Sequence, residues 1–174
     1  MNYLLKPIGE EIFGENVSIR FKTINEGFDK FKSFMLDGKD IDNGEKRLGA
    51  FIDKVFELNG EENSYVDFYF SRLDKAAKDR LISALISEDR LVLERHIREV
   101  KDETIYFRLS KESIPFLIRL STREILFSTF YFTKFQCTIW GNFDMKFPIF
   151  FSNEDNMKLY EDIAREYYLI PGTR

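Results

Sequence analysis

The stretch that decides the fold runs from Ile125 to Phe151 and reads ILFSTFYFTKFQCTIWGNFDMKFPIFF. Phe, Tyr and Trp are frequent in it, and aromatic and β-branched residues of this kind are typical of strands. The tetrapeptide Trp140-Gly141-Asn142-Phe143 interrupts the run and fits a two-residue turn with Gly at its first central position. The stretch therefore predicts a long strand followed by a β-hairpin.

The predicted turn also sets the register of the hairpin. It pairs Trp140 with Phe143 and Thr138 with Met145, because residues at equal distances from a turn lie opposite one another. Pro148 has no N–H to donate to a sheet ladder. We therefore expect the second arm of the hairpin to be an edge strand or to end at this proline.

Farther toward the N-terminus, the segments that begin at Tyr69 and Tyr106 resemble one another. Each reads as an aromatic strand, a Leu, a capping residue, a Lys and a helix that carries Leu-Ile. Asp74 and Ser110 are the predicted capping residues, because their short side-chain oxygens can accept hydrogen bonds from the free amides of a helix's first turn. The chain thus repeats a strand-and-helix unit.

Each copy precedes another run with the composition of a strand. Arg90 to Val100 follows the first copy and pairs, in this interpretation, with Thr104 to Leu109 in a central hairpin. Two βαβ units joined in this way predict an α+β protein with an antiparallel sheet and a ferredoxin-like βαββαβ core, in residues 64–132, with its helices on one face of the sheet.

The flanking segments complete a single globular domain, residues 1–174. An N-terminal extension, residues 1–60, is predicted to hold one strand and two helices, and residues 133–170 a hairpin and a helix. In the N-terminal extension, Val17, Ile19 and Phe21 alternate as in a strand, and helices are expected over Ile24 to Met35, capped by Thr23, and over Leu48 to Phe56. The segment Asp37 to Gly44 is the expected loop between these helices. The C-terminal helix is expected to be capped by Ser152, to carry an apolar stripe from Met157 to Tyr167 and to stop at Pro171-Gly172.

Composition narrows the class of protein. Apolar residues make up 44% of the chain and charged residues 32%, as in ordinary globular domains, and the net charge is −4. The net negative charge disfavours general affinity for nucleic acid, since that affinity needs a concentrated positive field over the phosphates. The N-terminus lacks the pattern of a signal peptide, and no apolar run reaches the ~18 residues of a membrane span, so we expect a cytoplasmic protein without a membrane partner.

Short motifs for the common cofactors and reactions are missing from the sequence. It contains neither GxxxxGK[ST], GxGxxG nor GxSxG. A single Cys and a single His exclude an intramolecular disulfide, a cysteine-based zinc site and a His-rich metal site. We therefore predict no cofactor, no metal and no catalytic residue.

Two single residues still deserve a functional alternative. His96 lies in the predicted strand and is interpreted as a solvent-facing side chain; the alternative is a general base oriented by Glu94 or Glu99. Cys137 is interpreted as a structural thiol, although Lys146 across the hairpin is the one feature that favours a reactive thiolate.

One face of the predicted sheet carries polar groups. Asp67, Tyr69, Tyr106 and Arg108 emerge opposite the apolar residues that contact the helices. This face either meets water or is covered by the helix Leu48 to Phe56. As alternatives, with His96 it forms the polar site of a small-molecule enzyme, or its tyrosines stack on the bases of a single-stranded nucleic acid.

The preferred hypothesis is a non-catalytic module that binds another protein. Small acidic chains without catalytic motifs are typical of immunity proteins, antitoxins, anti-defence inhibitors and similar accessory factors. Interfaces are rich in aromatic anchors with charges at the rim. The candidate interface residues are Trp140 and Phe143 on the hairpin and Asp37, Asp40 and Asp42 in the acidic loop.

Overall fold

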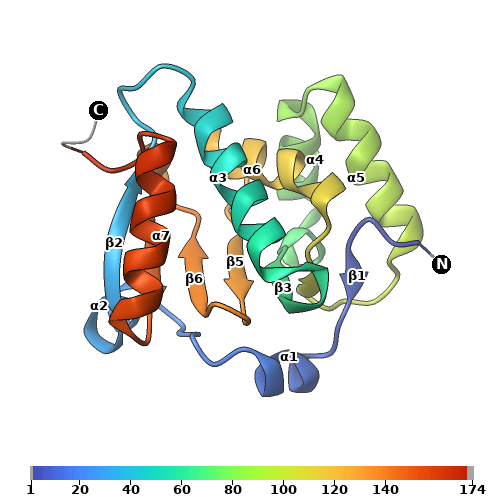
Figure 1. Ribbon diagram of the computed structural model, residues 1–174. Coiled ribbons are helices and arrows are strands. Elements are labelled where there is room, and N and C mark those ends of the chain that lie inside the picture. The colour runs from blue at the N-terminus through green and yellow to red at the C-terminus, as the bar shows by residue number, and fades with distance from the viewer. Residues whose placement is uncertain (1, 172–174) are drawn as a thin grey trace.

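The computed structural model describes residues 2–171, and these form an α+β protein around one antiparallel sheet (Figure 1). The sheet has seven strands in the order β1-β4-β3-β5-β6-β7-β2. The strands are β1 (Lys6–Pro7), β2 (Lys32–Asp37), β3 (Ser64–Asp67), β4 (Tyr106–Arg108), β5 (Thr129–Phe132), β6 (Cys137–Trp140) and β7 (Lys146–Phe151). The α-helices are α1 (Glu10–Asn16), α2 (Ile24–Lys30), α3 (Gly44–Asn59), α4 (Lys75–Ala84), α5 (Ser87–Glu99), α6 (Ile114–Thr122) and α7 (Glu154–Glu166). Four short 3-10 helices are η1 (Glu61–Asn63), η2 (Phe70–Arg72), η3 (Lys111–Ser113) and η4 (Phe143–Met145).

One face of the sheet builds the main core. Phe107, Val66, Phe130, Ile139 and Ile149 lie opposite one another across five strands, from β4 to β7, and are all buried. Side chains from α3 to α7 belong to the same apolar cluster, and Figure 1 shows α3 and α7 lying across this face. Period-two alternation along the strands therefore directs one row of side chains into the helical layer.

The other face carries a second row, which runs Arg108, Tyr65, Tyr131, Thr138 and Phe150 across the same strands. This row is covered by α1 and by the irregular segment 17–22. The Thr138 hydroxyl donates a hydrogen bond of 2.5 Å to the main-chain oxygen of Ile19 in the covering segment. Buried apolar side chains of α1 and of this segment form a small second cluster with Tyr65 and Tyr131. Both faces of the sheet are therefore covered, but the apolar cluster on the helical face is much larger than the cluster on the other face.

Ion pairs fix the helices to one another. The Arg119 guanidinium of α6 donates three hydrogen bonds of 2.6 to 3.1 Å to the buried Asp89 carboxylate of α5. On the other side of α6, Glu45 of α3 accepts bonds from the Thr122 hydroxyl at 2.6 Å and from Arg123 at 2.9 Å. Such charge-assisted bonds set the relative positions of α3, α5 and α6.

Several local predictions are confirmed. Thr23 and Asp74 cap α2 and α4 by accepting the amides of Glu26 and Ala77, and Ser110 forms a capping box at the start of η3. α3 buries its predicted stripe and ends at Gly60. The terminal helix α7 is also as expected, except that Asn153 rather than Ser152 caps it; its predicted stop includes Gly172, which lies outside the described residues.

The structure does not show the predicted ferredoxin-like core. The run Arg90 to Val100 is not a strand, because most of it belongs to α5. Buried positions at Asp89, Leu93 and His96 follow the helical spacing, whereas Leu91 is exposed. The sheet also has more strands than that fold, and β4 and β5 lie on either side of β3.

The hairpin prediction had the wrong turn and register. The tight connection joins β5 to β6, and the chain from β6 to β7 passes through η4 instead of a two-residue turn. Thr138 lies opposite Phe150 and not Met145. The cause is a longer β5–β6 pairing, since the Gly141 amide still donates to the Ser128 carbonyl. Pro148 lies in β7, which is not an edge strand, because β2 pairs with its other side.

Three N-terminal predictions were also wrong. Residues 17–22 alternate between buried and exposed, but they pair with no strand in the described chain. Lys32–Asp37 forms β2, so the helix that starts at Ile24 stops at Lys30. α3 packs against α6 in the main core and leaves the polar face of the sheet to the N-terminal segment.

Two glycines of α3 allow a matched test of this packing. A Cβ on Gly44 would lie 1.9 Å from the Gly38 carbonyl oxygen, whereas one on Gly49 would lie 3.8 Å from Ile118 Cγ2. Gly44→Ala should destabilise the protein by about 1–3 kcal/mol through overpacking against backbone. Gly49→Ala should stabilise it by about 0.5–1 kcal/mol through helix propensity. Urea unfolding of both variants measures these changes; changes of the same sign would contradict the close approach at Gly44.

Candidate functional site

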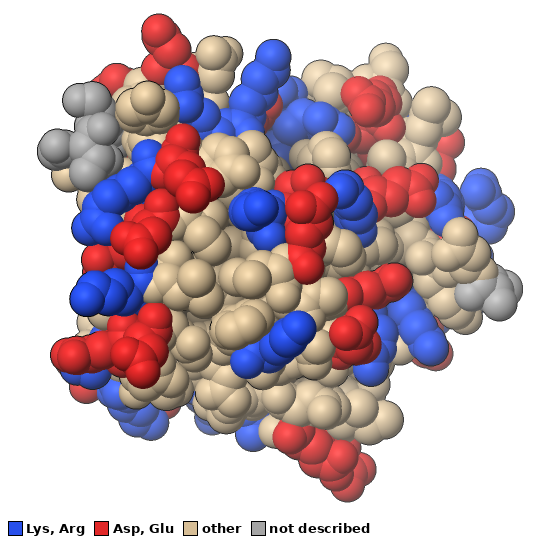
Figure 2. Space-filling view, in the orientation of Figure 1, with Lys and Arg blue, Asp and Glu red and all other residues tan. Residues whose placement is uncertain are grey.

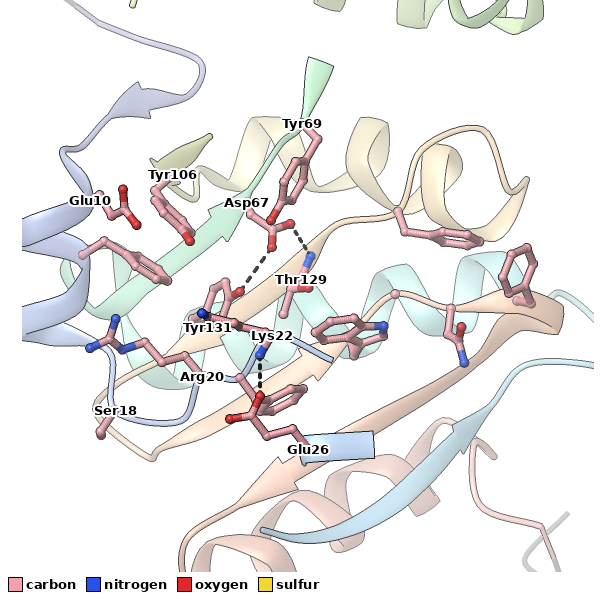
Figure 3. Close-up of a pocket in the computed structure, with 17 residues that line it drawn as sticks. Glu10, Ser18, Arg20, Lys22, Glu26, Asp67, Tyr69, Tyr106, Thr129 and Tyr131 are labelled. Carbon is pink, nitrogen blue, oxygen red and sulfur yellow. Dashed lines mark hydrogen bonds between the residues drawn. The ribbon is translucent and has the colours of Figure 1, made fainter. Parts of the chain in front are cut away.

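A groove of about 870 Å³ opens on the polar face of the sheet, where the N-terminal segment leaves it uncovered (Figure 3). Its floor comes from β3, β4 and β5, and its walls come from α1, the segment 17–22 and the β6–β7 connection. The lining residues are Glu10, Phe13, Ser18, Arg20, Phe21, Lys22, Glu26, Asp67, Tyr69, Tyr106, Phe127, Thr129, Tyr131, Trp140, Gly141, Asn142 and Phe143.

Asp67 occupies the floor of the groove because of its place in the sheet register. It lies opposite Tyr106 on β4, while Thr129 on β5 lies opposite Trp140 on β6. The Thr129 amide donates a hydrogen bond to Asp67 Oδ1 at 2.7 Å, and the Tyr131 hydroxyl donates one to Oδ2 at 3.2 Å. The Asp67 carboxyl thus links β3 to β5 at the floor of the groove.

The Asp67 carboxyl titrates far above its ordinary range. It is almost fully buried, and this desolvation raises its pKa to about 7, against the opposing effect of the bonds from Thr129 and Tyr131. Burial disfavours the charged form, whereas hydrogen bonds to the carboxylate favour it. At neutral pH the group therefore exists both with and without its proton.

Three tyrosines surround this carboxyl (Figure 3). Burial, together with the charge on Asp67, raises the pKa of Tyr69 to about 12 and raises the pKa values of Tyr106 and Tyr131. Their hydroxyls consequently stay neutral near pH 7. Phe13 of α1 stacks on Tyr106 with ring centroids 3.9 Å apart, which holds that ring in place.

Charged side chains of both signs line the side of the groove formed by the N-terminal segment. The Arg20 guanidinium lies over α1, where a Cβ on Gly14 would be 3.1 Å from Arg20 Nη1. Glu26 accepts a hydrogen bond from the Lys22 main-chain amide at 3.0 Å and pairs with Lys30 at 2.8 Å. This side therefore presents cations and anions together, opposite the Asp67 floor.

Aromatic rings form the remaining wall. Trp140 stacks on Phe21 with centroids 5.3 Å apart, and Phe143 meets Phe127 edge-on at 4.8 Å. Phe143 is 60% exposed, and Tyr69, which also lines the groove, is 40% exposed. The groove thus offers large apolar surfaces to a ligand around a polar floor.

The structure joins two of the surfaces considered from the sequence. Asp67, Tyr69 and Tyr106 line the same groove as Trp140 and Phe143. Chain connectivity gave no reason to expect this, since the two groups lie on different parts of the sequence.

Other candidate residues lie elsewhere. Arg108 donates to the Glu62 carbonyl at 2.9 Å and lies over the Tyr65 ring, outside the groove. Asp37 ends β2, and Asp40 and Asp42 belong to the loop before α3, none of them in the groove lining.

His96 is not the solvent-facing strand residue that we expected. It lies on α5, beneath the helical face of the sheet, with its ring 5.1 Å from Phe68 and 5.2 Å from Phe107. Burial lowers its pKa to about 4, partly opposed by Glu99. Its Nδ1 has no hydrogen-bond partner among the described residues. His96 therefore cannot act together with Asp67.

Cys137 is buried, and burial raises the pKa of its thiol. Lys146 does not lie across from it: Phe132 lies opposite Cys137 on β5, and Lys146 lies opposite Asp37 on β2. The shifted hairpin register removes the one feature that favoured a reactive thiolate.

Sequence reasoning missed Arg20, Phe21, Thr129 and Tyr131 as groove residues. Thr129 and Tyr131 alternate with Phe130 and carry the signal of a two-faced strand. The N-terminal residues carried no such signal, because their position depends on a long-range fold.

Comparison of the chain with protein-family models, curated proteins and solved structures finds no match in any of the three. Between residues 2 and 171, no cluster of His, Cys, Asp and Glu side chains is arranged to hold a metal ion. No helix in that range has the length and apolar character needed to cross a membrane. The described residues thus form an α+β fold with an aromatic-walled groove that has an acid at its floor.

Replacing Asp67 should reveal the cost of burying its charge. Its folded pKa lies above the unfolded value, so the protein loses stability as pH rises from about 4 to about 7, by up to about 4 kcal/mol. Asp67→Asn keeps the shape without the charge. Its stability relative to the native protein should therefore increase with pH across this window in urea unfolding, and a difference that stays constant would contradict the raised pKa.

His96 should produce the opposite pH dependence. Its folded pKa lies below the unfolded value, so its contribution to stability is lost as pH falls from about 6.5 to about 4, by up to about 3 kcal/mol. His96→Leu removes the titrating ring at similar volume. Relative to the native protein, this variant should gain stability as the pH is lowered through this range; thermal unfolding at several pH values tests this, and equal pH profiles would refute it.

Proposed function

We propose that the protein is a non-catalytic module that binds another protein through the groove over Asp67. The observation that supports this most directly is that Trp140 and Phe143 lie on the same concave surface as Asp67, Tyr69 and Tyr106. Aromatic anchors near the centre of an interface dominate binding energies. A concave surface that combines them with a few polar groups suits recognition of an inserted side chain or loop.

The size and charge of the surface support the same proposal. A volume of about 870 Å³ lies within the range of ligand-binding pockets in proteins. The groove lining itself carries charges of both signs, Arg20 and Lys22 as well as Glu10 and Glu26. On the other side of the sheet, where α3 and α7 lie, Figure 2 shows acidic and basic side chains interspersed without a broad positive area. Mixed rim charges and a net charge of −4 favour a protein partner with complementary basic groups over nucleic acid.

The class of protein proposed is that of immunity proteins, antitoxins and anti-defence inhibitors. Such proteins act by covering a partner's surface, which requires an exposed set of anchors on a rigid support. Phe143 supplies the exposed anchor, and the sheet beneath Trp140 supplies the support.

One observation favours a second candidate, a small-molecule enzyme. The Asp67 carboxyl, with a pKa of about 7, lies among three tyrosines at the floor of a cavity, and such a carboxyl can exchange protons at neutral pH. His96 and Arg108, the other members expected for such a site, lie outside it. A screen of small substrates with native protein and Asp67→Asn distinguishes this candidate.

Affinity capture from the native host's lysate, with and without nuclease, tests the preferred function. The tagged protein should retain one stoichiometric, nuclease-resistant protein. Phe143→Ala should weaken binding of that partner by about 2 kcal/mol, or about 30-fold in Kd, as loss of a hot-spot anchor does.

The matched control is Leu91→Ala, which removes an exposed apolar side chain of α5 that does not line the groove. It should bind like the native protein, and circular dichroism should show both variants folded. Capture of nucleic acid alone, or equal binding by folded Phe143→Ala, would overturn the proposal.

A further inference from the structure

Asp67 is a buried acid without a cationic partner. Between residues 2 and 171 its hydrogen-bond partners are Thr129 and Tyr131, and no Lys, Arg or His forms an ion pair with it. Only groups of Thr129 and Tyr131 stabilise its charged form. A buried carboxylate that lacks a counter-charge costs free energy, and an incoming cation recovers part of that cost.

The carboxylate also has unused acceptor capacity. Two carboxylate oxygens offer about four acceptor positions in all. The Thr129 amide occupies one on Oδ1 and the Tyr131 hydroxyl one on Oδ2, at 2.7 and 3.2 Å. The Thr129 side chain is a further hydrogen-bond donor to the carboxylate. At least one acceptor position therefore stays open to a donor in the groove that Asp67 lines.

We propose that Asp67 is the floor of a subsite for a cationic nitrogen, an ammonium or guanidinium group, that a ligand inserts into the groove. This inference deepens the proposed function and rests on the groove being the binding surface. A Lys or Arg side chain of the partner and a free amine share this chemistry.

The rings around Asp67 suit the same occupant. Tyr69, Tyr106 and Tyr131 line the groove beside the carboxyl (Figure 3). The electron-rich faces of aromatic rings attract cations, more strongly where water is excluded. Their neutral hydroxyls can also accept hydrogen bonds from an ammonium group.

The charged groups already present do not fill this role. Arg20 and Lys22 line the opposite side of the groove, and the Arg20 guanidinium packs over α1. The charge of Arg72 on η2 acts to lower the pKa values of the neighbouring tyrosines, whereas the charge of Glu10 on α1 acts to raise that of Tyr106. None of these side chains bonds to Asp67, so no cation among the described residues pairs with its ionised form.

Charge on Asp67 makes cation binding depend on pH. Only the ionised Asp67 carboxylate forms an ion pair with a cation. Because its pKa is about 7, the Asp67 carboxyl is neutral in most of the molecules at pH 6. The affinity for a cation that stays charged throughout should therefore be about tenfold higher at pH 8 than at pH 6. A neutral ligand should show no such increase.

The test uses three matched probes: phenethylamine, 2-phenylethanol and 3-phenylpropionate, which share a ring and differ in charge. Titration of each into the ¹⁵N-labelled protein is followed by NMR through the Thr129 amide, which donates directly to Asp67. Phenethylamine alone should shift this resonance in a saturable way, with the tenfold change in Kd between pH 6 and pH 8.

Two variants complete the test. Asp67→Asn should abolish saturable amine binding, whereas Glu11→Gln, which removes an exposed acid of α1 outside the groove lining, should leave it unchanged. Equal binding of the alcohol, retention of amine binding in folded Asp67→Asn, or no shift of the Thr129 amide at the solubility limit of the amine would overturn the subsite.

The source of the cation is distinguished by the captured partner. Loss of partner binding in Asp67→Asn, with the same pH dependence, assigns the subsite to a Lys or Arg side chain of that protein. Amine binding without any captured protein would leave the subsite in place while overturning the proposed function, so the two failures are separate.

Discussion

The cross-strand register of β3, β5 and β6 is the constraint on which the rest of the structure depends. It places Val66, Phe130 and Ile139 in one row beneath the helices and Tyr65, Tyr131 and Thr138 in a row on the opposite face. A shift of one residue would exchange these faces and bury the polar row in the main core. The helical layer, the N-terminal covering segment and the groove all follow from this alternation.

Asp67 marks the point at which that regular arrangement ends. The β3–β5 pairing reaches Val66 and Phe130, and beyond it the Asp67 side chain, rather than its main chain, accepts the next amide of β5. A neutral Asn offers a similar oxygen to that amide without a desolvated charge. An acid that opposes folding at neutral pH is the kind of local conflict expected at binding sites, where stability is traded for recognition.

Sequence patterns predicted the parts of the fold that depend on near neighbours. The caps at Thr23 and Asp74 need only a side chain and an amide three residues later, and the stripe of α3 needs only helical spacing. The same reasoning identified Asp67 as a residue of the polar face. It failed where distant segments decide the outcome: Lys32–Asp37 becomes a strand because β7 offers it a partner.

The run Arg90 to Val100 shows a different limit. Its apolar residues are consistent with a strand or a helix, and only packing selects α5, through the bond between Asp89 and Arg119 and the burial of His96 under Phe107. The groove depends still more on such long-range contacts. Arg20 and Phe21 reach it because α1 docks on Tyr106, more than ninety positions away in the chain.

The two walls of the groove have unequal support, and this affects what they can recognise. On the side of the sheet, Gly141 is held by its bond to the Ser128 carbonyl, and a Cβ there would lie only 2.6 Å from that oxygen, which fixes the backbone beneath Trp140. The segment 17–22, whose Phe21 stacks on Trp140, has no strand partner in the described chain and is held by the Thr138 bond and by aromatic contacts. A fixed wall sets the position of a ligand relative to Asp67, whereas a wall held mainly by side chains can adjust to its outer surface. If Asp67 receives a cation as proposed, the sheet side fixes the position of that cation, and the N-terminal side can adjust to the rest of the ligand.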